Sequence, residues 1–381
     1  MAEIVNRSQE AGASYERFAS WDLADFDVPT GREEQWRFTP IARMSSLLDP
    51  AAYGGTVHPS VDETQGARVE KVGLDDERVG VVAAPGDRCS AVSWNVVDEA
   101  TLITLPRGVD LDEPIVVAYR GEGGEAPLAS HLVIRAEEGA KARIVIEHTG
   151  SMRLNAGIEC ILEENSSLEF CSLQEWDRDA IHACHQRAKV GAHANLKHTV
   201  VTLGGDLVRV CPDVAFAGEG ANVDMYGVYF TDSDQHHEHR LWVNHDLPRC
   251  RSRVTYKGAL QGRDAHSVWV GDVVIGASAF GTDSYELNRN LVLNEGAKAD
   301  SVPNLEILNG DIEGAGHASA TGRFDDEQLF YLMSRGIDER RARKLVVHGF
   351  FAEIVSEIGI SDIETRLMDA IDARLEAGGR L

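Results

Sequence analysis

Histidine is the residue type in this chain best suited to bind a metal, and 14 histidines are present. His236, His237 and His239 cluster in the segment QHHEHRLWVNH. Alternate residues of a strand face the same side, so His237 and His239 could ligate a transition metal together. The simpler arrangement, which we expect, is that these histidines form an exposed polar edge of one strand.

His317 lies in a different setting, GDIEGAGHASATGRF, where a β-rich pattern gives way to a helical one. The flanking residues Gly310, Gly314, Gly316 and Gly322 allow tight backbone turns. Junctions between structural units often hold binding sites. A lone histidine can equally be structural, so the pattern alone leaves the role of His317 open.

Motifs of the common enzyme classes are absent from the sequence. It contains no GxxxxGK[ST], GxGxxG, GxSxG or HExxH, which removes the usual signals for ATP hydrolysis, dinucleotide binding and hydrolase chemistry.

Scattered cysteines in a large chain are usually buried small hydrophobic residues. We therefore expect no disulfide, zinc site or thiolate cage from the six cysteines, none of which forms a CxxC pair: Cys89, Cys160, Cys171, Cys184, Cys211 and Cys250.

The elements that must position these residues are mostly strands. From about Val79 to Thr321, short runs such as PIVVAY, ARIVIEH and SVWVGDVVI alternate with Gly, Asn and Asp turns. A turn motif, Gly or Asn followed by a small residue, recurs from residues 139, 165, 191 and 220, at intervals of 26, 26 and 29 residues. Such a period predicts a solenoid whose coils stack around a shared core. A sandwich or barrel is the alternative that many short strands also allow.

From Asp325 the apolar period becomes helical. Asp325 and Asp338 can cap the starts of two helices, and Gly336 suits the end of the first. Ser361 with Glu364 can form the capping box of a third helix. The predicted fold is mainly β, a right-handed parallel β-helix flanked by N-terminal and C-terminal helical regions. Its predicted parts are a mixed or helical region over 1–75, the β-helix core over 76–322 and a helical domain over 323–381.

Charge and hydropathy limit the partners of the chain. The formal net charge is −25, from 62 acidic and 37 basic residues, and such a surface repels nucleic acid. No apolar run reaches the roughly 20 residues that span a bilayer, and the N-terminus lacks a signal-peptide pattern. We expect a cytoplasmic protein that binds neither nucleic acid nor a membrane.

Several motifs, in order, resemble the SufB/SufD family of iron–sulfur cluster assembly scaffold proteins. The strongest similarity covers residues 235–275 and 286–337, with the motifs YKG at 256–258, P-x-LEI at 303–307 and LFYL-x-SRGI at 329–337. The helix ARKLVVHGFFAEIV at 342–355 and the N-terminal GREEQWRFTP at 31–40 also resemble family motifs.

Within the family, the chain resembles the SufD branch more than SufB. SufB reads EHEATTSK at the His317 segment and carries a cysteine in a QCDSMLIG-like run, whereas residues 288–294 here read NRNLVLN. Many SufD proteins read CSHGATVG at that segment. Here the histidine is kept as His317, and the cysteine position is Ala315.

The resemblance implies a non-enzymatic scaffold subunit. It would pair with SufB through the β-helix and bind the ATPase SufC through the C-terminal helices, and a homodimer could form in isolation. It would hold no stable cofactor alone, while an iron–sulfur cluster forms transiently at the SufB–SufD interface. His317 is then the candidate cluster ligand or proton acceptor. The candidates for SufC docking are Arg341, Lys344, Phe350 and Phe351, although adjacent phenylalanines cannot share one narrow helix stripe.

Two alternatives remain from the sequence. A carbohydrate-active enzyme on a β-helix would need paired carboxylates or acidic calcium sites, and we find no such constellation. A SufB-like paralogue would need the cysteine that the NRNLVLN segment lacks.

Overall fold

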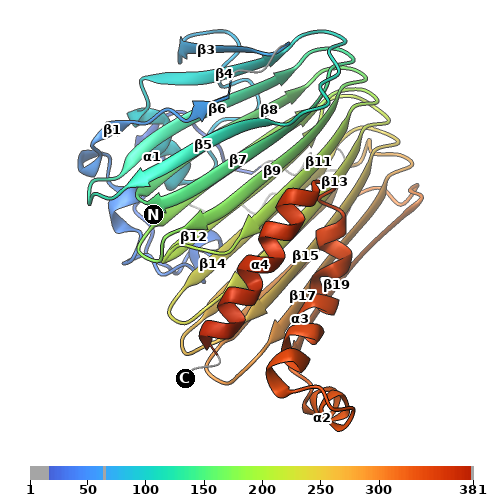
Figure 1. Ribbon diagram of the computed structural model, residues 1–381. Helices are drawn as coiled ribbons and strands as arrows, with labels where there is room; N and C mark the ends of the chain where they lie inside the picture. The colour runs from blue at the N-terminus through green and yellow to red at the C-terminus, as the bar shows by residue number, and fades with distance from the viewer. Residues whose placement is uncertain (1–16, 63–65, 379–381) are drawn as a thin grey trace.

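The computed structural model describes residues 17–62 and 66–378 and forms a β-solenoid of about eight turns (Figure 1). Strands hold 46% of the residues and helices 18%, so the fold is mainly β, as predicted. Helices lie at both ends of the chain, which also confirms the predicted arrangement.

Two parallel sheets form the flattened walls of the solenoid, and successive strands alternate between them. One sheet contains β4 (Glu99–Leu105), β6 (Leu128–Ala136), β8 (Arg153–Leu162), β10 (Ile181–Val190), β12 (Leu207–Phe216), β14 (His236–His245), β16 (His266–Ile275) and β18 (Lys298–Ile307). The other contains β5 (Ile115–Glu122), β7 (Lys141–Ser151), β9 (Ser167–Trp176), β11 (Asn195–Thr202), β13 (Asn222–Thr231), β15 (Arg251–Leu260), β17 (Asp283–Val292) and β19 (Gly314–Arg323).

The register between coils explains the repeat seen in the sequence. Ile181 pairs with Arg153, 28 residues earlier, and with Leu207, 26 residues later. The small residues of the turn motif, such as Ala140 and Ala221, are fully buried at the corners. One coil therefore spans about the same number of residues as one period of the turn motif.

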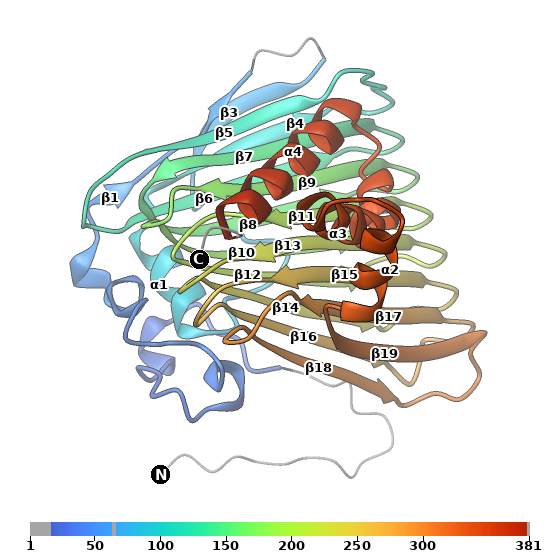
Figure 2. The same ribbon diagram turned by 60° about the horizontal axis from the view of Figure 1, so that its bottom comes forward.

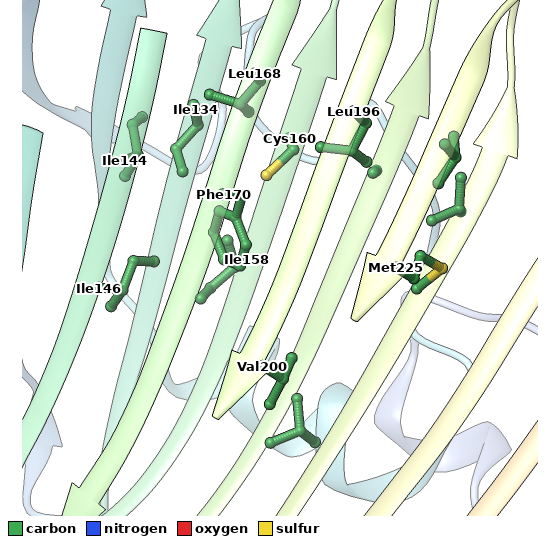
Figure 3. Close-up of a cluster of buried hydrophobic side chains, with 14 of the residues drawn as sticks. Ile134, Ile144, Ile146, Ile158, Cys160, Leu168, Phe170, Leu196, Val200 and Met225 are labelled. Atoms are coloured by element: carbon green, nitrogen blue, oxygen red, sulfur yellow. The ribbon is translucent and has the colours of Figure 1, made fainter. Parts of the chain in front are cut away.

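The core lies between the two sheets and is mostly aliphatic. Figure 3 shows Ile144 and Phe170 on one wall and Ile158 on the other, with their side chains in the space between them. Burial of this apolar surface is the main term that holds the coils together.

The YKG motif joins neighbouring coils and the helical region. Tyr256 lies beside Gly227 of the preceding coil, and Gly258 lies beside Tyr229, so each ring covers a glycine. A Cβ atom at position 258 would lie 1.8 Å from the Tyr229 ring, so only glycine fits. Lys257 points the other way, and its Nζ donates to Glu353 Oε2 at 2.7 Å.

The N-terminal segment folds against the first coils and along one sheet. It contains four short 3₁₀ helices, η1 (Leu23–Asp25), η2 (Glu34–Trp36), η3 (Ser45–Leu48) and η4 (Pro50–Ala52). The short strands β1 (Gly55–Thr56), β2 (Ser60–Val61) and β3 (Arg68–Gly73) pair with β6, β5 and β4, and α1 (Arg88–Val96) follows. The antiparallel β3 covers the edge of the first coil.

The C-terminal helices are α2 (Asp326–Ser334), α3 (Glu339–Ser356) and α4 (Ser361–Gly378). Asp325 and Asp338 cap α2 and α3, as predicted, by accepting from the backbone N–H groups of Glu327 and Arg341. Both views show α3 and α4 over the outer face of the sheet that contains β7 to β17 (Figures 1 and 2). No helix in residues 17–62 and 66–378 is long and apolar enough to cross a membrane.

Candidate functional site

His317 lies on β19, the last strand of its sheet, and its side chain is 43% exposed. It pairs in register with Glu286 of β17, and both side chains face the interior of the terminal coil. The distance from His317 Nδ1 to Glu286 Oε1 is 3.7 Å. The structure therefore places the predicted site residue beside a buried carboxyl group, at the end of the solenoid.

Glu286 is an unusual group for a solenoid interior. Its side chain is 1% exposed, and neither oxygen has a hydrogen-bond partner among residues 17–62 and 66–378. Burial, aided by the nearby charge of Asp272, raises the pKa of Glu286 to about 9. The carboxyl group is therefore protonated at neutral pH when nothing is bound to it.

Further polar side chains line the interior of this coil. Asn288 Nδ2 donates to Tyr229 Oη at 3.0 Å, and Ser301 Oγ donates to Asn288 Oδ1 at 2.7 Å. Ser319 Oγ, on the edge strand, donates to Ser301 Oγ at 2.7 Å. In the terminal coil a hydrogen-bonded network thus extends from the core to the exposed end.

The terminal coil also presents open strand edges. β18 and β19 end their respective sheets, and the described part of the chain offers each of them a partner strand on one side only (Figure 2). Unpaired edges are templates for pairing with another chain unless they are covered. The geometry therefore combines a half-exposed histidine with a surface suited to association.

A groove of about 1370 Å³ runs along the outer face of the β10–β18 sheet and reaches His317. Its far end lies near Asp87 and His185, and the N-terminal segment borders it. Arginines and carboxylates both line the groove, so it does not offer a surface of one charge.

A buried ion network fixes the N-terminal segment to this sheet. Arg209 donates to Asp87 Oδ2 at 2.9 Å and to Glu238 Oε1 at 3.2 Å, and it stacks on Trp36. Thr39 Oγ1 donates to Glu238 Oε2 at 2.8 Å. Although burial alone would raise the pKa of Glu238, the hydrogen bond with His236 and the charge of Arg209 lower it to about 2. The N-terminal WRFTP motif and the QHHEHR segment therefore meet in space.

The expectation that the histidine cluster forms an exposed edge is wrong. His236, His237 and His239 are all buried, because the N-terminal segment covers one face of β14 and the core covers the other. His239 Nε2 bonds Thr202 Oγ1 at 2.9 Å, and burial lowers the pKa of His239 to about 3. Within the described residues, no group of three or more His, Cys, Asp or Glu side chains gathers to hold a metal.

All six cysteines are buried and unpaired by disulfides. Burial raises the pKa of Cys211 to about 11 and those of Cys171 and Cys184 to about 12, and it also raises those of the other three. These thiols remain protonated at neutral pH, which suits packing rather than metal ligation.

We expect the native protein to resist thiol reagents. Because the thiols are buried and protonated, Ellman's reagent at neutral pH should titrate fewer than one cysteine per folded chain, and all six after denaturation. A native thiol that reacts as fast as free cysteine would contradict this assignment of the cysteines to the core.

The predicted docking residues on α3 do not share one surface. Arg341 is exposed, and Lys344 Nζ is held by Glu376 of α4 at 2.7 Å. Phe350 is half-buried. Phe351 is fully buried against the sheet, so, contrary to the prediction, its side chain is not accessible to a partner.

Exposed apolar side chains gather one helix earlier. Phe330 and Tyr331 of α2 are 73% and 57% exposed, Met333 of α2 is also exposed, and Leu345 is exposed on α3. Several large apolar side chains exposed close together in sequence are a candidate for an interaction site. The sequence reasoning missed this patch, although the LFYL run carries more apolar residues than one buried face of a short helix requires.

Comparisons with known proteins identify the family of the chain. A family described as "SUF system FeS cluster assembly, SufBD core domain" matches residues 119–350. An iron–sulfur cluster assembly SufBD family protein of Mycobacterium tuberculosis is 46% identical over 95% of this chain and 93% of its own length, and one of Mycobacterium leprae is 47% identical over 94% and 93%. The iron–sulfur cluster assembly protein SufD of Escherichia coli is 24% identical over all of this chain and 96% of its own. The chain therefore belongs to the SufBD family of iron–sulfur cluster assembly proteins.

Proposed function

We propose that this chain is a SufD-type scaffold subunit that pairs with SufB through the open end of its solenoid. The observation that carries the proposal is the position of His317 on the edge strand β19, half-exposed beside unpaired strand edges. The similarity to Escherichia coli SufD over all of this chain supports the SufD assignment. We infer that the subunit works in the cytoplasm and is not itself an enzyme.

In this proposal the iron–sulfur cluster is the cargo of the complex. His317 contributes an imidazole nitrogen, or accepts a proton, where the cluster forms transiently at the SufB interface. Imidazole can replace thiolate as a ligand of iron. Because the chain's own thiols are buried and protonated, the thiolates must come from SufB or another partner.

The C-terminal helices provide the docking surface for the ATPase SufC. The exposed side chains of Phe330, Tyr331, Met333 and Leu345 supply apolar contact area, and Arg341 lies exposed at the start of α3. α3 is tied to the solenoid through the ion pair of Lys257 with Glu353. A force applied by SufC would therefore be transmitted to the coils near His317.

The His317→Ala variant tests the proposal. Co-expressed with SufB and SufC, the variant should still co-purify with both, because the half-exposed imidazole contributes little to the fold. Cluster formation in cells, measured as the activity of a cluster-dependent enzyme, should fall by on the order of tenfold or more, as expected when a metal site loses a supporting group.

A matched variant on the same strand gives the control. Ala320 faces outward on β19, and Ala320→Ser should leave both assembly and cluster formation unchanged. Normal cluster-dependent activity with His317→Ala in an intact complex would refute the role of His317. Failure of the wild-type chain to co-purify with SufB and SufC would refute the scaffold assignment itself.

A further inference from the structure

A second potential ligand lies beside His317. The Glu286 carboxyl group is buried, and both of its oxygens are without a hydrogen-bond partner among the described residues. Buried polar groups are normally hydrogen-bonded, and an orphaned carboxyl is costly unless it serves a purpose. The 3.7 Å separation from His317 Nδ1 is too long for a direct hydrogen bond.

The surrounding residues make room for this carboxyl group. Gly271 of β16 lies opposite, and a Cβ atom there would come within 2.3 Å of Glu286 Oε2. The nearby Asp272 is engaged differently, because its Oδ1 accepts from Asn304 Nδ2 at 2.7 Å. Glu286 is therefore a buried carboxyl group of this coil that remains free to bind something next to His317.

We propose that Glu286 and His317 together form a two-ligand half-site for ferrous iron at the open end of the solenoid. The inference rests on the proposed function, which supplies iron as the cargo. It adds a carboxylate ligand that no cysteine or histidine motif of the sequence indicated. Ligation replaces the carboxyl proton, which passes to solvent.

The distance between the two groups fits a shared metal ion. Metal–nitrogen and metal–oxygen bonds are about 2.0–2.2 Å long, so two ligands of one ion lie about 3.0–3.5 Å apart. The observed 3.7 Å needs only a small rotation of the half-exposed imidazole. A mixed imidazole and carboxylate set is typical of non-haem ferrous sites.

The half-site is incomplete on this chain alone. The described residues contain no cluster of three or more metal-binding side chains, and the two ligands lie where the coil opens toward a partner. The remaining ligands would come from the partner subunit, so we expect the isolated chain to bind the ion weakly and the complex to bind it more tightly.

The test is anaerobic titration of the purified full-length chain with ferrous ammonium sulfate, followed by calorimetry and by paramagnetic broadening of the histidine NMR signals. The wild-type protein should bind one Fe(II) and broaden the His317 signal. Glu286→Gln keeps the size of the side chain but removes the carboxylate, and it should weaken binding on the order of tenfold or more. His317→Ala should weaken binding to a similar extent.

Glu306→Gln is the matched control, because Glu306 is an exposed carboxylate on the neighbouring β18. Its binding should equal that of the wild-type protein. If Glu286→Gln fails to fold by circular dichroism, Glu286→Asp replaces it, since the shorter side chain retracts the carboxylate from Nδ1. Wild-type affinity in a folded Glu286 variant, or no Fe(II) binding by the wild-type chain at millimolar iron, would overturn the half-site. Either result would leave the separate test of His317 in the complex unaffected.

Discussion

Replacing Arg209 with alanine is expected to lower the free energy of unfolding by roughly 3–5 kcal/mol, as for other buried ion networks that lose one member. Arg209 is 2% exposed and bridges the buried carboxylates of Asp87 and Glu238. The positive groups around them hold the pKa values of both carboxyl groups below their ordinary range, so both are charged at neutral pH. Without Arg209, two buried charges would lose their shared partner.

The same substitution should loosen the N-terminal segment. Trp36 would lose the guanidinium stacked on its ring, and Glu238, which accepts from Thr39, would keep only Arg240, at 3.5 Å, as an arginine partner. Urea denaturation gives the stability change, and limited proteolysis should show faster cleavage before β1. Arg107→Ala serves as the control, because its ion pair with Glu138 is mostly exposed and is worth about 0–1 kcal/mol. Equal stability of the two variants would show that the network does not anchor the segment.

The solenoid could be predicted from the sequence because its signal is local. The corner residues recur at nearly constant intervals, and each corner needs a small buried residue such as Ala140 or Ala221. The caps Asp325 and Asp338 are equally local, since each accepts from a backbone N–H group two or three residues further on. Features of this kind are visible in a short window of sequence.

The burial of the histidine cluster could not be predicted in this way. His236 and Glu238 are covered by residues about 200 positions earlier, among them Thr39, which contacts Glu238 directly. Nothing within the QHHEHR segment itself indicates that the N-terminal segment covers it. The polarity of this segment therefore predicted an exposed strand edge. In the structure the segment is buried and takes part in an ion network.

The position of Glu286 could be predicted from the sequence only in part. Glu286, Asn288 and Asn290 alternate along β17, and all three face the interior. Three alternating polar residues that include a carboxylate are a signal for a special coil, because the inward polar side chains of earlier coils, such as Gln174 and His182, are neutral amides, hydroxyls and imidazoles that bond one another. The sequence could have shown that pattern, but only the structure shows that Asn288 and Asn290 are hydrogen-bonded while Glu286 is not.

Phe351→Ala is expected to destabilise the packing of the C-terminal helices by roughly 3–5 kcal/mol, the usual cost of removing a buried phenylalanine. Phe351 is fully buried in a cluster that joins α3 and α4 to the outer face of the sheet, including Val228 and Phe230. Hydrogen exchange should show α3 and α4 opening more readily, with little change in the early coils, because coils of a solenoid contact mainly their neighbours.

Phe330→Ser on α2 is the matched substitution, since Phe330 is 73% exposed. Its effect on stability should stay within about 0.5 kcal/mol, as for other surface positions. Its effect on SufC capture should be large, because a central aromatic anchor at an interface commonly contributes about 2 kcal/mol or more. Loss of SufC with Phe330→Ser at unchanged stability would separate docking from folding, which Phe351→Ala cannot do. Unchanged SufC capture by a folded Phe330→Ser variant would remove Phe330 from the docking surface and return that role to the exposed side of α3 around Arg341.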